Sequence, residues 1–175
     1  MPDVHYEIRP VDRITVGAVG EPGKRVFYLQ VAGADTQLTL GLEKEQVQML
    51  ALSVEQFLND LQQRFPNLAE PDDRYEESEM QLEPPLEPEF QIGTMGLGYD
   101  DREDRLLLVL REAVEESEPK ENAAEASLWC TRDQLQRLSK WGVELARRGR
   151  PICGNCGRPI DPEGHFCPRK NGHKH

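Results

Sequence analysis

The sequence predicts an α+β fold of antiparallel sheet, with two main helices on one face and a small zinc knuckle at the C-terminus. Two observations carry this prediction. Three strand-like segments followed by a helix-like segment occur twice, over residues 13–65 and 89–148. Three of the four cysteines and three of the four histidines lie in the last part of the chain. We therefore expect two βββα-like halves in a body over 1–149, followed by a zinc-binding knuckle over 150–175.

The composition fits one domain with a modest hydrophobic core and a short additional segment. The chain has 175 residues, of which 37% are hydrophobic and 30% charged, which is enough apolar material for a single core. No apolar run approaches the roughly 18 residues of a membrane-spanning helix, and residues 1–5 lack the basic and apolar parts of a secretory signal. Because three of the four cysteines stand in a metal-binding pattern, we expect a reducing, cytoplasmic setting.

The net charge of −11 is unevenly distributed. Residues 1–131 hold 28 acidic and 11 basic residues, whereas residues 132–175 hold 4 acidic and 10 basic residues. A basic tail on an acidic body favours contact with nucleic acid or another acidic partner, or with the acidic body of the same chain. The sequence leaves these alternatives open.

The first half begins with strand-forming segments. A short strand is expected over 4–8 and a longer one over 13–19. Residues 20–23 contain proline and glycine in positions typical of a turn. Residues 25–32 are β-branched and aromatic and apolar on both faces, so they predict a central strand. Residues 37–42 carry leucine at alternate positions, as a strand with one buried face does.

A helix is expected over 43–65. Glu43 and Glu45 lie in its first turn, where the helix dipole favours acidic side chains, and Pro66 ends it. Its apolar residues recur at three- and four-residue steps and form a stripe for the core: Val47, Leu50, Val54, Phe57, Leu58, Leu61 and Phe65.

Residues 66–88 differ in character from both halves. They contain five prolines and eight acidic residues with one arginine, Arg74. This composition predicts a linker or mobile loop, either as a solvated spacer or as an acidic interaction motif.

The second half repeats the pattern of the first. Residues 90–99 predict a strand, and 100–104 an acidic turn. Residues 105–114 have five consecutive apolar residues at their centre, 106–110, and predict the most buried strand of the chain. A polar loop over 115–125 leads to a short strand over 126–130. Three glycines in the first strand indicate bulges or close backbone approach: Gly93, Gly96 and Gly98.

The last helix begins at Thr131, which forms a capping-box pattern with Gln134. It ends in basic residues before Gly149, as helix C-termini prefer. Cys130, just before the helix, is expected to be a small apolar core residue. The helix carries an apolar stripe of Leu135, Leu138, Trp141 or Gly142, and Leu145.

The tail contains a Cys3His pattern suited to tetrahedral zinc. Two residues separate Cys153 from Cys156, so a tight turn can aim both sulfurs at one point. His165 and Cys167 lie two apart, so an extended segment points both the same way. The predicted ligands are therefore Cys153, Cys156, His165 and Cys167. His173 and His175 also lie within reach, and His173 is the alternative fourth ligand.

The zinc is expected to be structural, because four protein ligands close the site and a catalytic zinc keeps an open position. A proline- and glycine-rich segment this short cannot bury a core, so metal binding would supply its folding free energy. A redox pair and a structural disulfide are the competing interpretations of Cys153 and Cys156.

The body offers little for catalysis. Residues 17–23 lack the spacing of a phosphate-binding loop and precede a strand, so a hairpin turn is expected. The acidic residues of 100–104 lack EF-hand spacing and favour an exposed hairpin tip over a cation site. His5 is the only histidine outside the tail, which leaves little for a Ser/His or Cys/His centre. The sequence leaves open a catalytic site built from two carboxylates.

Four segments of the chain carry a resemblance to a known family. They are GAVGEPGKRVFYLQ (17–30), LEKEQV (42–47), FQIGTMGLGYD (90–100) and GRPICGNCGRPIDPEGHFCPRKNG (149–172). Together they resemble the uncharacterised bacterial family known as domain of unknown function 3090, a repeat-protein family of unknown function.

The resemblance implies the ligand set Cys153, Cys156, His165 and Cys167. The pattern of this family often ends in Asn-Gly-Tyr where this chain has His173, which favours His165 as the fourth ligand. The family has no established activity. Proteins of this kind are encoded beside a phosphoglycerate-mutase-like phosphatase, which the resemblance offers as a partner.

These observations favour a zinc-binding cytoplasmic protein that acts as a non-enzymatic interaction or adaptor module. The first alternative is a nucleic-acid-binding protein that uses the basic C-terminal knuckle. The second is an enzyme with an unrecognised carboxylate site on the glycine-rich strands.

Overall fold

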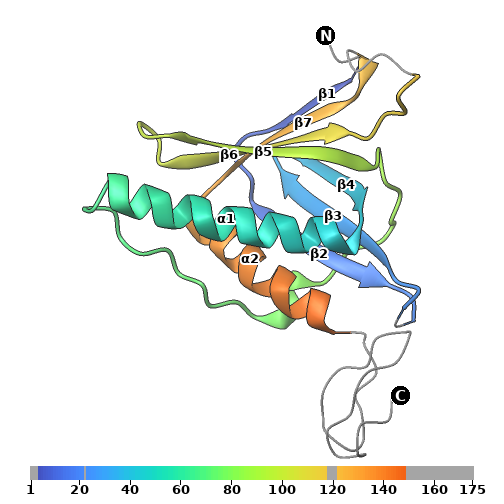
Figure 1. Cartoon of the computed structure of the whole chain (residues 1–175), viewed down its shortest axis with the longest axis horizontal. Helices are drawn as coiled ribbons and strands as arrows, with labels where there is room; N and C mark the ends of the chain where they lie inside the picture. The colour runs from blue at the N-terminus through green and yellow to red at the C-terminus, as the bar shows by residue number, and fades with distance from the viewer. Residues whose placement is uncertain (1–3, 22, 118–121, 149–175) are drawn as a thin grey trace, which may run out of the picture.

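The computed structural model describes residues 4–21, 23–117 and 122–148. These residues form an α+β fold with one four-stranded sheet, one three-stranded sheet and two α-helices (Figure 1). After β1, three strands and a helix occur twice in succession, as the sequence predicts. The elements are β1 (His5–Ile8), β2 (Arg13–Val19), β3 (Val26–Gly33), β4 (Thr36–Leu42), α1 (Lys44–Arg64), the 3₁₀ helix η1 (Glu77–Met80), β5 (Ile92–Asp100), β6 (Arg105–Glu112), β7 (Glu125–Cys130) and α2 (Arg132–Arg147).

The three-stranded sheet has the antiparallel order β2-β3-β4, so β3 is central as predicted. Its hydrophobic residues Leu29 and Val31 are fully buried. Gly20 and Gly23 adopt φ values of +111° and +85°, in the left-handed region that glycine enters without steric cost. The segment around them is therefore the hairpin turn between β2 and β3 that the sequence favours over a phosphate-binding loop.

The four-stranded sheet has the order β1-β7-β6-β5. The pairs β5–β6 and β6–β7 are antiparallel, and Leu106, Leu108 and Leu110 of the central strand β6 are buried. The prediction of purely antiparallel sheet is wrong for β1, which runs parallel to β7. Beyond β1, the amide of Val11 donates to the carbonyl of Trp129 at 2.9 Å, and the chain then enters β2. The chain thus continues beside the end of β7 before it leaves the four-stranded sheet.

Both predicted helices are present, and Figure 1 shows them on the same side of the four-stranded sheet. The Oγ1 of Thr131 accepts from the amide of Gln134 at 3.0 Å and the Thr131 amide donates to Gln134 Oε1 at 2.8 Å, which confirms the capping box. α1 packs on α2, where Ser139 Oγ donates to the carbonyl of Ala51 at 2.9 Å. α1 buries Val47, Leu50, Ala51, Val54, Leu58 and Leu61.

Residues 66–88 connect the two halves, but they pack against the body rather than forming a solvated spacer. Met80 is 7% exposed, and its carbonyl accepts from Thr15 Oγ1 of β2 at 2.7 Å. The buried side chain of Gln30 in β3 makes two hydrogen bonds of 2.8 Å with the backbone of Glu83. We call this segment the strap. Composition alone misses these contacts, because the strap contributes mainly backbone groups to them.

The strap also covers α2. Tyr75 packs edge-on to Trp141, with ring centroids 5.8 Å apart, and the amide of Asp72 donates to Asp133 Oδ1 at 2.8 Å. Three basic residues at or just after α2 form ion pairs with carboxylates of the strap: Arg137 with Asp72, Lys140 with Asp73 and Arg148 with Glu77. Over the described residues, the basic end of the chain therefore lies against the acidic body.

The core unites both halves in one cluster of buried residues that draws on both sheets and both helices. None of the helices in the described part of the chain is long and apolar enough to cross a membrane. The predicted zinc knuckle over 150–175 lies outside the described residues, as does part of the predicted polar loop over 115–125.

Candidate functional site

The five residues predicted as metal ligands lie outside the described residues: Cys153, Cys156, His165, Cys167 and the alternative His173. Their chemistry fits zinc, because three thiolates and one imidazole suit a tetrahedral site. The described chain ends just after α2, where Arg148 Nη2 lies 2.6 Å from Glu77 Oε1 of the strap.

Within the described residues, no group of three or more histidine, cysteine or acidic side chains could hold a metal ion. The acidic turn after β5 is a hairpin tip, as the sequence favours. Its last carboxylate, Asp104, accepts from the guanidinium of Arg132 at 2.9 and 3.0 Å and from the hydroxyl of Tyr99 at 2.8 Å. These contacts tie the β5–β6 turn to the first turn of α2.

The electrostatics of this trio favour a structural role. The hydrogen bond from Arg132 is the main cause that lowers the pKa of Asp104, against the opposing effect of partial burial. Burial, followed by the hydrogen bond to Asp104, raises the pKa of Tyr99 to about 12. At neutral pH the carboxylate is therefore charged and the phenol protonated, so the trio holds one arrangement.

Two other side chains of the described body, Cys130 and His5, are of chemically reactive types, but their surroundings also favour a structural role. Cys130 is fully buried, and burial raises the pKa of its thiol to about 12, which makes it a poor nucleophile. This confirms the prediction that Cys130 is a core residue. His5 is exposed on β1, with Nδ1 3.6 Å from Glu125 Oε1 of the neighbouring strand β7.

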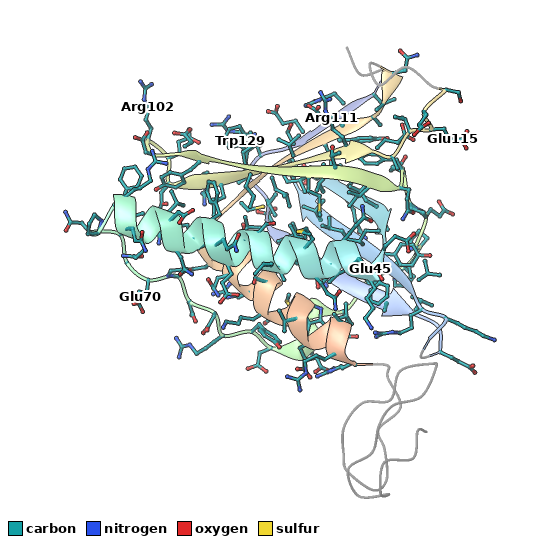
Figure 2. All side chains as sticks on the ribbon, viewed as in Figure 1. Glu45, Glu70, Arg102, Arg111, Glu115 and Trp129 are labelled. Atoms are coloured by element: carbon teal, nitrogen blue, oxygen red, sulfur yellow. The ribbon has the colours of Figure 1, made fainter. Side chains whose placement is uncertain are left out.

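A groove runs between α1 and β5, and we call it the α1–β5 groove. It has a volume of about 710 Å³. Met49 and Phe57 of α1 and Met95 and Leu97 of β5 provide apolar walls. Acidic side chains stand toward the two ends of the α1 wall, and Figure 2 shows Glu45 at the N-terminal end of the helix.

The second wall of the groove is the edge strand of the four-stranded sheet. Among the described strands, β5 pairs only with β6, apart from an isolated bridge between Gly41 and Gln91 just before β5 begins. Gln46 Nε2 donates to the carbonyls of Ile92 at 2.8 Å and Gly93 at 3.4 Å, which ties α1 to the start of the strand. Beyond this point the free edge of β5 borders the groove.

Sequence reasoning did not identify this groove. One feature of the sequence that could have revealed the groove is Met49, an apolar residue that falls outside the apolar stripe of α1. In the structure Met49 is 57% exposed. A second signal is the glycine-dotted strand. Gly93 marks a register shift, and a Cβ there would meet the backbone of Ala113 at 2.7 Å, which confirms the predicted bulge and close approach. The same prediction is wrong for Gly96 and Gly98, where the register is regular. Apart from its chain neighbours, no described atom lies within 4 Å of a Cβ placed on Gly96, and the nearest to one on Gly98 is Cβ of Leu107 at 4.0 Å.

A family model described as "Protein of unknown function (DUF3090)" matches residues 6–167. The matched range takes in the described body from Tyr6 onward and ends at Cys167, so it includes four of the predicted ligands and leaves out His173. That description gives no activity, source or repeat character. No curated protein and no solved structure matches the chain.

Proposed function

Because the chain belongs to the DUF3090 family, whose description assigns no activity, we propose a function from its own residues: it is a zinc-binding protein that acts as an interaction or adaptor module. The observation that carries the zinc assignment is the Cys3His pattern of Cys153, Cys156, His165 and Cys167. The family match, which ends at Cys167, supports this set over one that uses His173.

In this proposal the zinc is structural. Four protein ligands leave no open position for water or substrate. Coordination then folds the tail, since structural zinc supplies on the order of 10–16 kcal/mol in zinc-finger peptides. The thiolates must stay reduced for this, so the protein would work in the cytoplasm.

The described body supports an interaction role more than a catalytic one. Asp104 is committed to Arg132 and Tyr99, and Cys130 is buried with a raised pKa. The α1–β5 groove, by contrast, offers an apolar surface beside an edge of β5 that no described strand pairs with.

The nucleic-acid alternative draws on the basic charge of residues 132–175. Within the described part of that range, Arg132, Arg137, Lys140 and Arg148 form ion pairs with carboxylates of the body. These side chains are therefore less available to phosphates, and the interaction role is favoured.

The phosphoglycerate-mutase-like phosphatase is the first partner to test. We expect the purified phosphatase to bind the zinc-loaded full chain and to lose at least about tenfold in affinity for Cys153→Ser. Isothermal titration calorimetry measures the binding, and circular dichroism checks that the variant keeps the melting transition of its body.

Equal binding of the phosphatase to both proteins would contradict a zinc-dependent interface. Binding of duplex DNA by the same wild-type protein at low salt, with a steep loss on adding salt, would instead favour the nucleic-acid alternative.

A further inference from the structure

We infer that the α1–β5 groove binds an extended peptide segment of a partner protein, which adds as a strand to the free edge of β5 and carries basic residues at both ends of an apolar stretch. The inference deepens the proposed interaction function by assigning it a surface. It does not require the zinc site, because every residue that it uses lies in the described body.

The free edge of β5 is the first reason. Among the described strands, only β6 pairs with β5 from Thr94 to Asp100, so the other side of this strand presents backbone donors and acceptors without a strand partner. An edge of this kind is a template for an added strand, and proteins commonly cover or charge such edges. Addition of an extended peptide to an exposed edge is a recurring mode of peptide recognition.

The walls of the groove are the second reason. Met49 is 57% exposed on α1, and the partly buried side chains of Phe57, Met95 and Leu97 line the same space. The volume of about 710 Å³ lies within the range of roughly 300–1,000 Å³ typical of ligand sites. Apolar side chains on one face of an added strand would enter this space, because alternate residues of a strand point the same way.

The acidic side chains that line the groove indicate that the peptide carries basic residues at both ends. Glu45 and Asp60 line it, and none of its described lining residues is a lysine or arginine. These two carboxylates lie at opposite ends of the α1 wall, about 22 Å apart along the helix at a rise of 1.5 Å per residue. An extended chain advances about 3.4 Å per residue, so cationic side chains roughly six residues apart would reach both.

A second copy of the chain is a poorer occupant on the same grounds. The chain carries a net charge of −11, and a symmetric β5–β5 contact would bring two acidic grooves together. Like charges brought together across an interface disfavour association. A cationic partner segment meets no such repulsion.

The test uses the zinc-loaded full chain and a blocked synthetic peptide of about seven residues, with valine and threonine alternating between two terminal lysines. We expect saturable binding in ¹⁵N NMR titrations, with the largest amide shifts in Thr94 to Tyr99. The same peptide with terminal glutamates should bind at least about tenfold more weakly, because the rim of the groove is acidic.

Two matched variants locate the site. Met49→Lys places a charge within the groove and should weaken peptide binding at least about tenfold. Leu52→Lys makes the same change in charge on the same helix, at a residue of similar exposure, 52% against 57%, that does not line the groove. It should change the affinity by less than about twofold, because surface charges of this kind contribute little.

Three outcomes overturn the inference: no saturable binding, equal binding of the two peptides, or equal loss in both variants. Sedimentation of the full chain supplies a fourth, because a dimer dissociated by Met49→Lys would assign the groove to a second copy. The double variant Cys153→Ser, Cys156→Ser separates this inference from the zinc proposal. It should keep peptide binding while it loses zinc, whereas failure of the peptide leaves a zinc-dependent phosphatase interface intact.

Discussion

The carboxylate of Asp104 joins three elements through two partners. It accepts hydrogen bonds from Tyr99 of β5 and Arg132 of α2, and it stands in the turn before β6. The sequence shows an acidic cluster here but not which carboxylate is engaged, since the partner Arg132 is distant in the chain. A charge that looks available for a cation or for catalysis is in fact used to hold the fold.

This arrangement predicts the pH dependence of stability. The pKa of Asp104 is lowered from its ordinary value of 3.8, so its pairing stabilises the fold above about pH 4 and is lost as the pH falls through the lowered pKa. Asp104→Asn should therefore be less stable than wild type at pH 6, by about 1 kcal/mol or less because the side chain is 43% exposed. The difference should shrink toward pH 2.

Urea unfolding of both proteins across this pH range measures the effect. Asp101→Asn in the same turn is the matched control, since Asp101 is exposed and should leave the unfolding midpoint unchanged. A stability gap between wild type and Asp104→Asn that is independent of pH would count against the role given to the Asp104–Arg132 pair.

At the scale of elements, the strap is the main departure from what the sequence predicts. Proline and acidic residues gave it the composition of a solvated linker. Its attachment depends on backbone groups of Met80 and Glu83 that pair with Thr15 and Gln30. Composition does not report such bonds, because every residue type carries the same backbone donors and acceptors except proline. The apolar residues along the strap are too few and too widely spaced to show the periodicity of a helix or a strand.

The contact between the strap and β2 makes a testable prediction at Gly17. A Cβ at this position would lie 2.4 Å from Cγ of Leu82, so the strap packs directly on the backbone of β2. Gly17→Ala should lower the free energy of unfolding by about 1–3 kcal/mol through overpacking. Adding Leu82→Ala to the Gly17→Ala variant should recover part of the lost free energy of unfolding, because the two changes affect one contact.

Chemical denaturation of the two single variants and the double variant measures this coupling. Gly96→Ala is the matched control, since it also places alanine in a strand but, apart from its chain neighbours, no described atom lies within 4 Å of the new Cβ. It should leave stability unchanged or slightly increased. Strictly additive effects at Gly17 and Leu82 would show that the strap does not pack on β2 in solution.

At the scale of the whole molecule, the two halves could be predicted because each strand and helix has a clear period. The leucines of β4 alternate, residues 106–110 of β6 are all apolar, and the stripe of α1 recurs every three or four residues. Periodicity indicates which face of a strand or helix is buried, but not which other element packs against that face. The parallel pairing of β1 with β7, the strap and the α1–β5 groove all depend on that second question, and the sequence predicted none of them.

The predicted zinc site depends on a different kind of signal. Ligand types and spacing are local, so Cys153, Cys156, His165 and Cys167 can be proposed without knowing how the body folds. The choice of fourth ligand is less local, because His173 lies within reach of the cysteines in the sequence as His165 does. Direct measurement of the metal decides both points.

That measurement is the zinc content of the untagged full chain by elemental analysis, with wild type beside Cys167→Ser, His165→Ala and His173→Ala. The proposal predicts one zinc per chain in wild type and in His173→Ala, and loss of the metal in the other two variants. Absence of zinc from wild type would contradict the zinc-binding claim itself. Zinc retained by His165→Ala but lost from His173→Ala would keep the claim and reassign its fourth ligand.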